Sequence, residues 1–470
     1  MPPGSEPLVM VAVCRAPRSA PRPRCGVNVL LMPAAVRQAP LYRALALALR
    51  ERGHRADLLP IFPRTHGFLE RAGERCVDFT SEFRTCFRAA TGCGRADLES
   101  LAGFELALAK PALAPRLARA VAAARTFFSE RFRDGGYQRL VLNNGAGLVC
   151  GAAKEAFARQ PEGVLWHTEA GFLPDTLVLD RRGVNRHGSL MALDPDRLPD
   201  PEPGTAEYLA DLVAGRVASR SSGRVFGGWR EHLDARRMVL PEVALLSGRS
   251  PLEVLRDFVA PKVHHESERP PEPDAASLGD YVFVPLQVHD DTQVVLNSER
   301  VRDMAELVAT VAGALPARLA LVVKPHPMDR GRTRLDAVER ELAALAGRGR
   351  LVHERPSMEL VRHARAVVTL NSTVGLEGLL HGRPVATLAS AWYAKPGLAT
   401  AVGGTAELTA WLAAPIAPRA EAVLKLVSFL RHHYLLPGGF RSVTPEEARD
   451  MAARVLGDAA PPSWQRAGLG

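Results

Sequence analysis

Short apolar runs rich in β-branched residues alternate with helix-like stretches in two separate parts of the chain. Such runs occupy residues 27–31 and 139–142 in the first part, and residues 319–323 and 366–370 in the second. Strands that alternate with helices form parallel sheets covered by helices, and ligands bind these sheets beyond the carboxyl ends of the strands. The sequence therefore predicts an α/β fold whose site lies in the loops that follow the strands.

A chain of 470 residues is too long for one hydrophobic core, and its pattern divides at a stretch rich in proline and acidic residues. We expect two Rossmann-like, doubly wound domains that face each other across a cleft, followed by a helical C-terminal tail. The predicted segments are a disordered, basic and proline-rich arm (1–25), an N-terminal domain (26–187), a helical insert and linker (188–278), a second domain (279–400) and C-terminal helices (401–470).

The composition excludes several classes of protein. With 47% hydrophobic and 24% charged residues, the chain has the make-up of a globular protein. No run approaches the length of a transmembrane helix, so none is expected. The six cysteines form no C-x-x-C pair, which argues against zinc or thioredoxin chemistry and is typical of reduced thiols in a cytosolic protein. We therefore expect a cytoplasmic location.

The net charge of +9 comes from 60 basic against 51 acidic residues. An arginine-biased composition explains this excess, and a basic face for anionic lipid or an anionic polymer explains it equally well. No basic stripe interleaved with aromatic residues and no helix-turn-helix pattern occurs, so nucleic acid is not an expected partner.

Two loops of the second domain carry groups that an anion needs. Lys324 and His326 follow one predicted strand, and Pro327 holds His326 out of helical geometry. These side chains could bind a phosphate, although a strand that simply ends in prolines has the same pattern.

Asn371, Ser372 and Thr373 follow the next predicted strand and precede a helix. Their hydroxyls and backbone N–H groups suit a phosphate, while an ordinary helix cap explains them as well. Glu377, one turn further on, could reach a ribose hydroxyl.

Three acidic residues are candidates for catalysis. Asp290 and Asp291 lie in a loop after the strand at 281–284 and could bind or deprotonate an acceptor, or form a solvated turn. Glu169 ends a strand of the first domain at the expected cleft. A carboxylate in that place could act as a base or as a nucleophile, and a loop acid in a salt bridge is the alternative role for Glu169.

A rival pattern lies in the first domain. Gly145, Gly147 and Gly151 follow a strand, and Glu169 comes about twenty residues later, where the ribose-binding acid of a dinucleotide site would stand. The glycine spacing departs from the fingerprint, and no P-loop occurs. An NAD(P)-dependent enzyme is therefore kept only as an alternative.

With three strings of the second domain, the chain resembles the capsular polysaccharide synthesis family that includes the bacterial β-Kdo transferases of capsule assembly. The strings are Pro-Leu-Gln-Val-His-Asp-Asp-Thr-Gln at 285–293, Lys-Pro-His-Pro at 324–327 and Asn-Ser-Thr-Val-Gly-Leu-Glu-Gly-Leu-Leu-His-Gly-Arg-Pro at 371–384. A weaker match is Glu-Ala-Gly-Phe-Leu-Pro at 169–174 with Gly-Val-Asn at 183–185.

The resemblance implies a GT-B architecture and a retaining transfer of Kdo, or a related sugar, from a CMP-activated donor. The first domain would take the acceptor and the second the donor. The residues implied for the nucleotide sugar are Gln287, Lys324, His326, Pro327, Asn371, Ser372, Thr373 and Glu377, and those for catalysis are Glu169, Asp290 and Asp291. Many family members carry a second polar residue where this chain has Ala170, so the identity of the catalytic carboxylate stays open.

The resemblance also implies partners. The acceptor would be a lipid or an oligosaccharide, and the protein would work beside capsule assembly and export proteins at the inner leaflet of the cytoplasmic membrane. No metal and no cofactor other than the CMP-sugar substrate is implied, because the charged loops supply Lys and His instead of a carboxylate cluster. A non-catalytic export or assembly accessory and a nucleotide-sugar epimerase stay open as alternatives.

Overall fold

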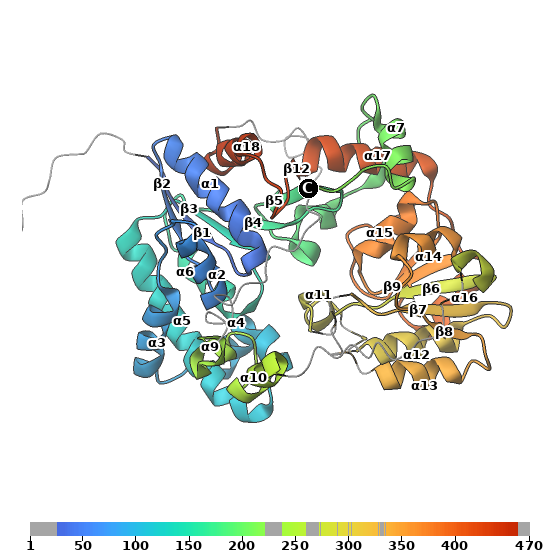
Figure 1. Cartoon of the computed structure of the whole chain (residues 1–470), viewed down its shortest axis with the longest axis horizontal. Coiled ribbons are helices and arrows are strands. Elements are labelled where there is room, and N and C mark those ends of the chain that lie inside the picture. The colour runs from blue at the N-terminus through green and yellow to red at the C-terminus, as the bar shows by residue number, and fades with distance from the viewer. Residues whose placement is uncertain are drawn as a thin grey trace, which may run out of the picture.

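A computed structural model of the chain describes residues 26–220, 237–259, 272, 274–288, 290–298, 300–301, 303–327, 329, 333 and 335–458. The predicted arm (1–25), His289 and most of the proline-rich linker lie outside these residues. Two α/β units, each built on a six-stranded sheet, make up the molecule (Figure 1). The predicted pair of Rossmann-like domains is confirmed.

The first sheet has the strand order β12-β5-β4-β3-β1-β2. Its strands are β1 (Asn28–Met32), β2 (Arg55–Leu58), β3 (Arg139–Asn143), β4 (Val164–Ala170), β5 (Thr176–Asp180) and β12 (Leu436–Pro437). The four strands β2, β1, β3 and β4 are parallel, while β5 and β12 are antiparallel to their neighbours. These two antiparallel strands were not predicted.

The second sheet has the order β11-β10-β9-β6-β7-β8, and all its strands are parallel. Its strands are β6 (Tyr281–Pro285), β7 (Ala320–Lys324), β8 (Gly349–Leu351), β9 (Ala366–Thr369), β10 (Val385–Thr387) and β11 (Thr400–Ala401). The apolar residues of β6 and β9 are buried on both faces, as expected for a central parallel strand. In chain order this is the doubly wound 3-2-1-4-5-6 arrangement, which places a ligand crevice between β6 and β9.

Helices cover both sheets. In the first part of the chain they are α1 (Ala39–Glu51), α2 (Pro63–Arg71), α3 (Phe79–Ala89), α4 (Arg95–Leu108), α5 (Ala114–Gly135), α6 (Gly147–Phe157), α7 (Thr205–Val213), α9 (Pro241–Leu245) and α10 (Pro251–Val259). Helix α5 shows why these segments are helical: it buries Leu117, Val121 and Phe128 on one face and ends at Gly136, whose positive φ suits a helix terminus. The predicted insert reaches back to the first domain, because α9 packs against α3 and α5.

The remaining helices are α11 (Thr292–Val295), α12 (Met304–Ala314), α13 (Leu335–Ala343), α14 (Ser357–His363), α15 (Thr373–Leu380), α16 (Thr405–Ala413), α17 (Ala420–Phe429) and α18 (Pro445–Leu456). The tail is helical apart from β12. After α17 the chain returns to the first domain, where β12 pairs with β5 and α18 packs on α1 (Figure 1). None of the helices in the described ranges has the length and apolar character needed to cross a bilayer.

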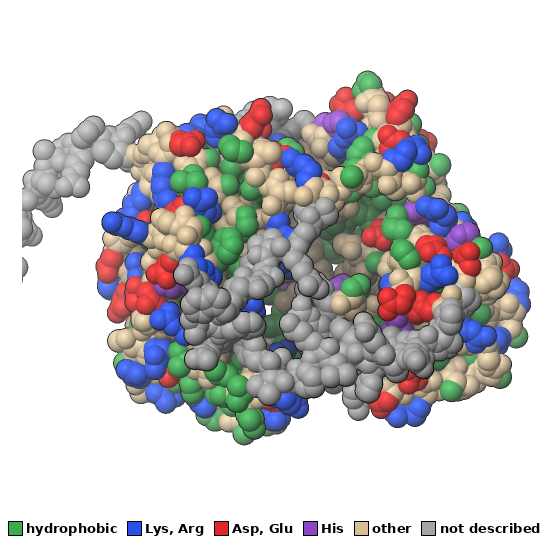
Figure 2. Space-filling model, in the orientation of Figure 1, with side chains coloured by type: hydrophobic (Ala, Val, Ile, Leu, Met, Phe, Trp, Pro, Cys, Tyr) green, Lys and Arg blue, Asp and Glu red, His purple; other side chains and the backbone are tan. Residues whose placement is uncertain are grey.

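The two domains share a buried contact. One hydrophobic cluster contains Leu173 and Val178 of the first domain together with Leu376 and Tyr393 of the second. The rings of Phe172 and Trp392 meet within it, with centroids 4.8 Å apart. This packing between the domains holds the cleft-facing loops close together. On the face that Figure 2 shows, basic and acidic side chains are interspersed over both domains.

Candidate functional site

Two buried amides join the strand ends at the crevice of the second sheet. Gln287 follows β6 and Asn371 follows β9, and Nε2 of Gln287 donates to Oδ1 of Asn371 at 3.0 Å. Asn371 in turn donates from Nδ2 to the carbonyl oxygen of Gln293 at 3.1 Å. Gln287 is therefore part of the scaffold that positions Asn371, because both side chains are buried.

Helix α15 begins at this point with a capped N-terminus. Oγ of Ser372 accepts from the backbone N–H of Val374 at 3.2 Å, so the N-cap alternative for Ser372 is confirmed. Tyr393 lies over the same turn and donates from its hydroxyl to the carbonyl oxygen of Ser372 at 2.6 Å. The close approach requires Gly375, since a Cβ there would lie 2.3 Å from the Tyr393 hydroxyl. Thr373 is exposed beside this turn.

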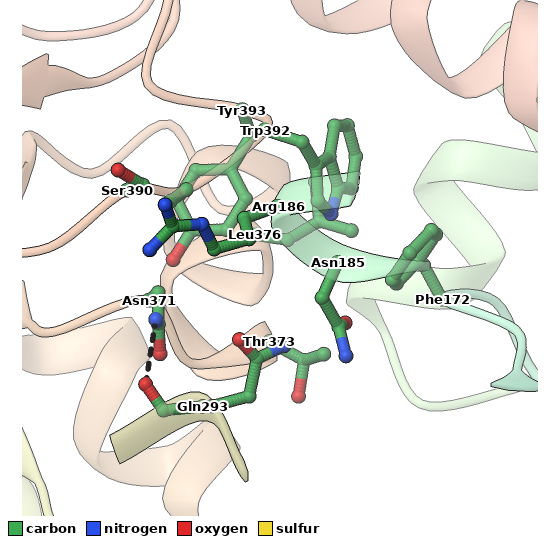
Figure 3. A pocket seen from close by; sticks show the side chains of 11 residues that line it. Phe172, Asn185, Arg186, Gln293, Asn371, Thr373, Leu376, Ser390, Trp392 and Tyr393 are labelled. Carbon is green, nitrogen blue, oxygen red and sulfur yellow. Dashed lines mark hydrogen bonds between the residues drawn. The ribbon is translucent and has the colours of Figure 1, made fainter. Parts of the chain in front are cut away.

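A hollow with about 340 Å³ of empty volume opens in front of α15 (Figure 3). The second domain contributes polar groups and an aromatic wall, and the first domain contributes the opposite side. The described lining includes Gln293, Asn371, Thr373, Trp392 and Tyr393 from the second domain and Phe172, Asn185 and Arg186 from the first. A hollow with an aromatic wall on one side and a few converging polar groups is typical of a small-molecule site.

A second hollow, of about 230 Å³, adjoins the first and contains Glu169. The two share Phe172, Asn185 and Trp392, so a ligand in one reaches the edge of the other. The predicted catalytic acid and the predicted anion loop therefore lie in neighbouring spaces, one from each domain.

Glu169 is half-buried at the end of β4. Its carboxylate accepts from Nδ2 of Asn144 at 2.9 Å and from the backbone N–H of Ala170 at 3.0 Å. Burial raises its pKa, the two hydrogen bonds and Arg37 oppose that effect, and the charge of Asp291 adds to it. A carboxylate whose pKa is raised toward neutral pH is a stronger base than an ordinary one.

The Lys-Pro-His-Pro loop is only partly placed as predicted. Lys324 is buried, and Nζ donates to the carbonyl oxygen of His353 after β8, while burial lowers its pKa. The described residues that line the first hollow do not include Lys324, and its contact with a phosphate stays a prediction. His326 is half-buried and Pro327 is exposed, and both lie after β7, away from that lining.

The acidic pair of the β6 loop has structural partners. Asp290 forms an ion pair with Arg249 at 2.5 Å, which connects the loop to the segment before α10. Asp291 caps α11 by accepting from the backbone N–H of Gln293 at 2.8 Å. Asp290 thus bridges two segments. Of the two aspartates, it is Asp291 whose charge raises the pKa of Glu169.

Glu377 is half-buried one turn into α15 and outside the described lining of the hollow. Burial raises its pKa to about 7. A ribose contact of Glu377 stays a prediction.

The rival dinucleotide site is occupied by the protein itself. Glu105 of α4 is buried at the N-terminus of α6, where Oε1 accepts from the backbone N–H of Leu148 at 2.8 Å. Gly147 lies so close that a Cβ there would be 2.7 Å from this oxygen. A pyrophosphate would need the same N–H groups, so the structure argues against dinucleotide binding at this helix.

Arg186, Trp392 and Tyr393 are among the residues of the first hollow that were not predicted as site residues. They follow β5 and β10, which belong to different sheets, so local sequence pattern does not show that they meet. The Gly-Val-Asn string just before Arg186 was the available signal for the first of them.

Comparisons with known proteins find similarity to capsule polysaccharide proteins. Residues 256–427 match the model described as capsule polysaccharide biosynthesis protein. The capsule polysaccharide export protein KpsS of Escherichia coli is 31% identical over 246 residues, which cover 49% of this chain and 61% of that protein. The capsule polysaccharide modification protein LipB of Neisseria meningitidis is 36% identical over 132 residues, covering 27% and 32%. The chain thus spans less than two thirds of either relative.

Among solved structures, the β-Kdo 2,4 transferase of Thermosulfurimonas dismutans KpsC aligns with a TM-score of 0.40 and 15% identity, covering 67% of this chain and 87% of that one. The fold assignment rests on the strand order of this chain itself. Over residues 256–427, less than half of its length, the chain is similar to the capsule polysaccharide biosynthesis family.

Proposed function

We propose that this protein is a glycosyltransferase of capsular polysaccharide synthesis that transfers Kdo, or a related sugar, from a CMP-activated donor. One observation carries the proposal: two adjoining hollows between the domains, with a helix N-terminus in one and Glu169 in the other. The match of residues 256–427 to the family model and the resemblance of the loop strings to those of β-Kdo transferases support the same activity.

The donor occupies the first hollow in this proposal. The N-terminus of α15 favours the CMP phosphate, and Thr373 and Asn371 supply polar contacts beside it. Trp392 and Tyr393 offer an apolar wall to the sugar or the base. Glu377 binds the ribose, and His326 contributes if the loop at 324–327 moves toward the donor.

Glu169 carries the chemistry from the facing domain. In a retaining reaction it attacks the anomeric carbon at the boundary between the hollows while CMP leaves, and the acceptor hydroxyl then displaces Glu169 from that carbon and gives its proton to water. A retaining and metal-independent reaction is part of this proposal. The acceptor is a lipid or an oligosaccharide that enters through the second hollow, and the protein works beside capsule assembly and export proteins at the cytoplasmic face of the membrane.

Purified protein tests the proposal directly. With CMP-Kdo and a lipid or oligosaccharide carrying a free hydroxyl, we expect CMP release that depends on the acceptor and transfer of the sugar onto it. The variant Glu169→Gln keeps the size of the side chain and should lose transfer. No turnover with any CMP-sugar, across lipid and oligosaccharide acceptors, would refute the proposal.

A second candidate is an accessory role in export or modification, which the names of two relatives suggest. It predicts that capsule production is unchanged in cells that carry Glu169→Gln at normal protein level. An epimerase, in contrast, would turn over a UDP-sugar without any acceptor.

A further inference from the structure

A positively charged side chain of the first domain reaches into the donor hollow. Arg186 belongs to a short 3-10 turn (Asn185–His187) and lines the first hollow opposite Asn371 and Thr373. Figure 3 shows its guanidinium next to Tyr393 and Ser390, above Asn371. Nη1 of Arg186 donates to the carbonyl oxygen of Leu296, just after α11, at 3.1 Å. The side chain therefore extends from one domain to the other across the hollow.

The loop that carries Arg186 is fixed at both ends by one buried carboxylate. Asp180 accepts from the backbone N–H of Arg182 at 2.8 Å, and from the N–H and hydroxyl of Ser189 at 2.7 and 2.9 Å. It also accepts from the hydroxyl of Tyr434 at 2.8 Å. These bonds tie the start and the end of the loop to the same anchor, so the position of Arg186 does not depend on a flexible segment.

The backbone of the loop is strained where it turns toward the hollow. Asn185 has a φ of +55°, a left-handed conformation that costs energy for a residue with a side chain. At Gly183 a Cβ would lie 2.8 Å from Cβ of His187, so the turn also requires a glycine. Strain of this kind is retained where it positions a functional group.

Arg186 supplies the positive charge in the lining of the two hollows. Among the described residues that line the two hollows, Arg186 alone carries a formal positive charge. Lys324, predicted for this role, instead donates to the carbonyl oxygen of His353. A guanidinium has five N–H donors in a planar fork, so it can bind a protein carbonyl and an anion together.

We propose that Arg186 binds the anionic group of the donor from the facing domain. This inference rests on the proposed function, and the anion is either the phosphate of the nucleotide or the carboxylate of a sugar acid. Arg186 is then a specificity-determining residue: it favours donors with a negative charge in front of α15 and links donor binding to the contact between the domains.

Calorimetry with Arg186→Met tests the proposal, using CMP, cytidine and a CMP-linked sugar acid as ligands. Loss of a charge-assisted bond of this kind weakens binding about tenfold or more. We expect this loss for CMP if the anion is the phosphate, or for the CMP-linked sugar acid alone if it is the carboxylate. Cytidine, which lacks both anions, should bind the variant and the wild type equally.

Two further variants control the experiment. Arg182→Met removes an exposed arginine of the same loop outside the described lining and should bind all three ligands as the wild type does. Arg186→Lys keeps the charge and should retain part of the affinity. Wild-type affinity of Arg186→Met for both anionic ligands would overturn the inference and leave the proposed function intact. If the wild type itself binds neither ligand, the proposed function fails and this inference fails with it.

Discussion

Replacing Glu105 by Gln should make the first domain more stable at neutral and alkaline pH. The carboxyl group is 2% exposed, and burial raises its pKa to about 7 from an ordinary value of 4.5. Oε1 accepts one hydrogen bond from Leu148, and Oε2 is buried without a partner among the described residues. Gln keeps the shape and the acceptor but never ionises.

The magnitude follows from the shift in pKa. Each unit corresponds to about 1.4 kcal/mol, so ionising Glu105 in the folded protein costs about 3 kcal/mol of folding free energy. Attraction to the N-terminus of α6 offsets this by about 0.3–1 kcal/mol, which leaves about 2–3 kcal/mol. The folded state holds the proton more tightly than the unfolded state, so stability falls as the pH rises from 4.5 to about 7. Above that window the cost is complete, and below it the cost is absent.

Urea unfolding at pH 5, 7 and 8 measures the effect, with hydrogen exchange of peptides from β3 and α6 to isolate the first domain. We expect Glu105→Gln to match the wild type at pH 5 and to exceed it at pH 8, while peptides from β6 and β9 stay unchanged. Glu99→Gln removes an exposed carboxylate of the same helix and should change stability by less than about 0.5 kcal/mol. A Glu105→Gln protein that is less stable than the wild type at pH 8 would show that the anion is stabilised at this helix.

Four other substitutions test the site. Glu169→Gln should slow acceptor-dependent CMP release by about a hundredfold or more while CMP binds normally, and unchanged turnover of this variant would remove Glu169 from the mechanism. Because burial raises the pKa of Glu169, the wild-type protein should lose activity on acidification at a pH above the ordinary range of a glutamate. Gln287→Leu removes the donor to Asn371 and should lower the free energy of unfolding in urea by about 1–3 kcal/mol. Calorimetry should also show weaker CMP binding, and normal affinity would mean that Asn371 keeps its position without Gln287. Gly375→Ala should lower the free energy of unfolding by about 1–3 kcal/mol, because the added Cβ meets the hydroxyl of Tyr393. Adding Tyr393→Phe to this variant should recover part of the loss, and a double variant whose loss equals the sum of the two single losses would contradict this account.

The sequence predicted those parts of the site that depend on local pattern. Asn371, Ser372 and Thr373 follow a buried strand and begin a helix, so their place at the crevice follows from strand–helix alternation alone. Glu169 was predicted in the same way, from the end of β4. The two doubly wound sheets are visible for the same reason, because central strands such as β1, β6, β7 and β9 are apolar runs of their own.

The remaining features of the fold and the site depend on contacts between residues that lie far apart in the sequence. Lys324 turns to a carbonyl after β8, and Asp290 pairs with Arg249, a residue 41 positions earlier in a segment without clear periodicity. The strand β12 has only two residues, too few for any pattern, and it pairs with β5 across more than 250 residues. Trp392 has the character of a core residue in the sequence, and only its contact with Phe172 places it between the hollows.

Both sheets have a buried pair of amide side chains at the crevice, but the helices that follow these pairs differ. In the second domain Gln287 bonds Asn371, and in the first domain Gln38 donates to Asn143 at 2.6 Å, so a buried amide pair joins the strands on either side of each crevice.

The helices that follow these amide pairs then diverge. The N-terminus of α6 is closed by the carboxylate of Glu105, whereas that of α15 opens onto the first hollow with Thr373 at its edge. Under the proposed function an anionic nucleotide binds in the second domain, whereas in the first domain it would meet a fixed negative charge or a buried acid. With that helix closed, the first domain is left to supply Glu169 and Arg186, which reach the shared hollows from the opposite side. This division explains why the two domains, built on the same plan, are expected to differ in function.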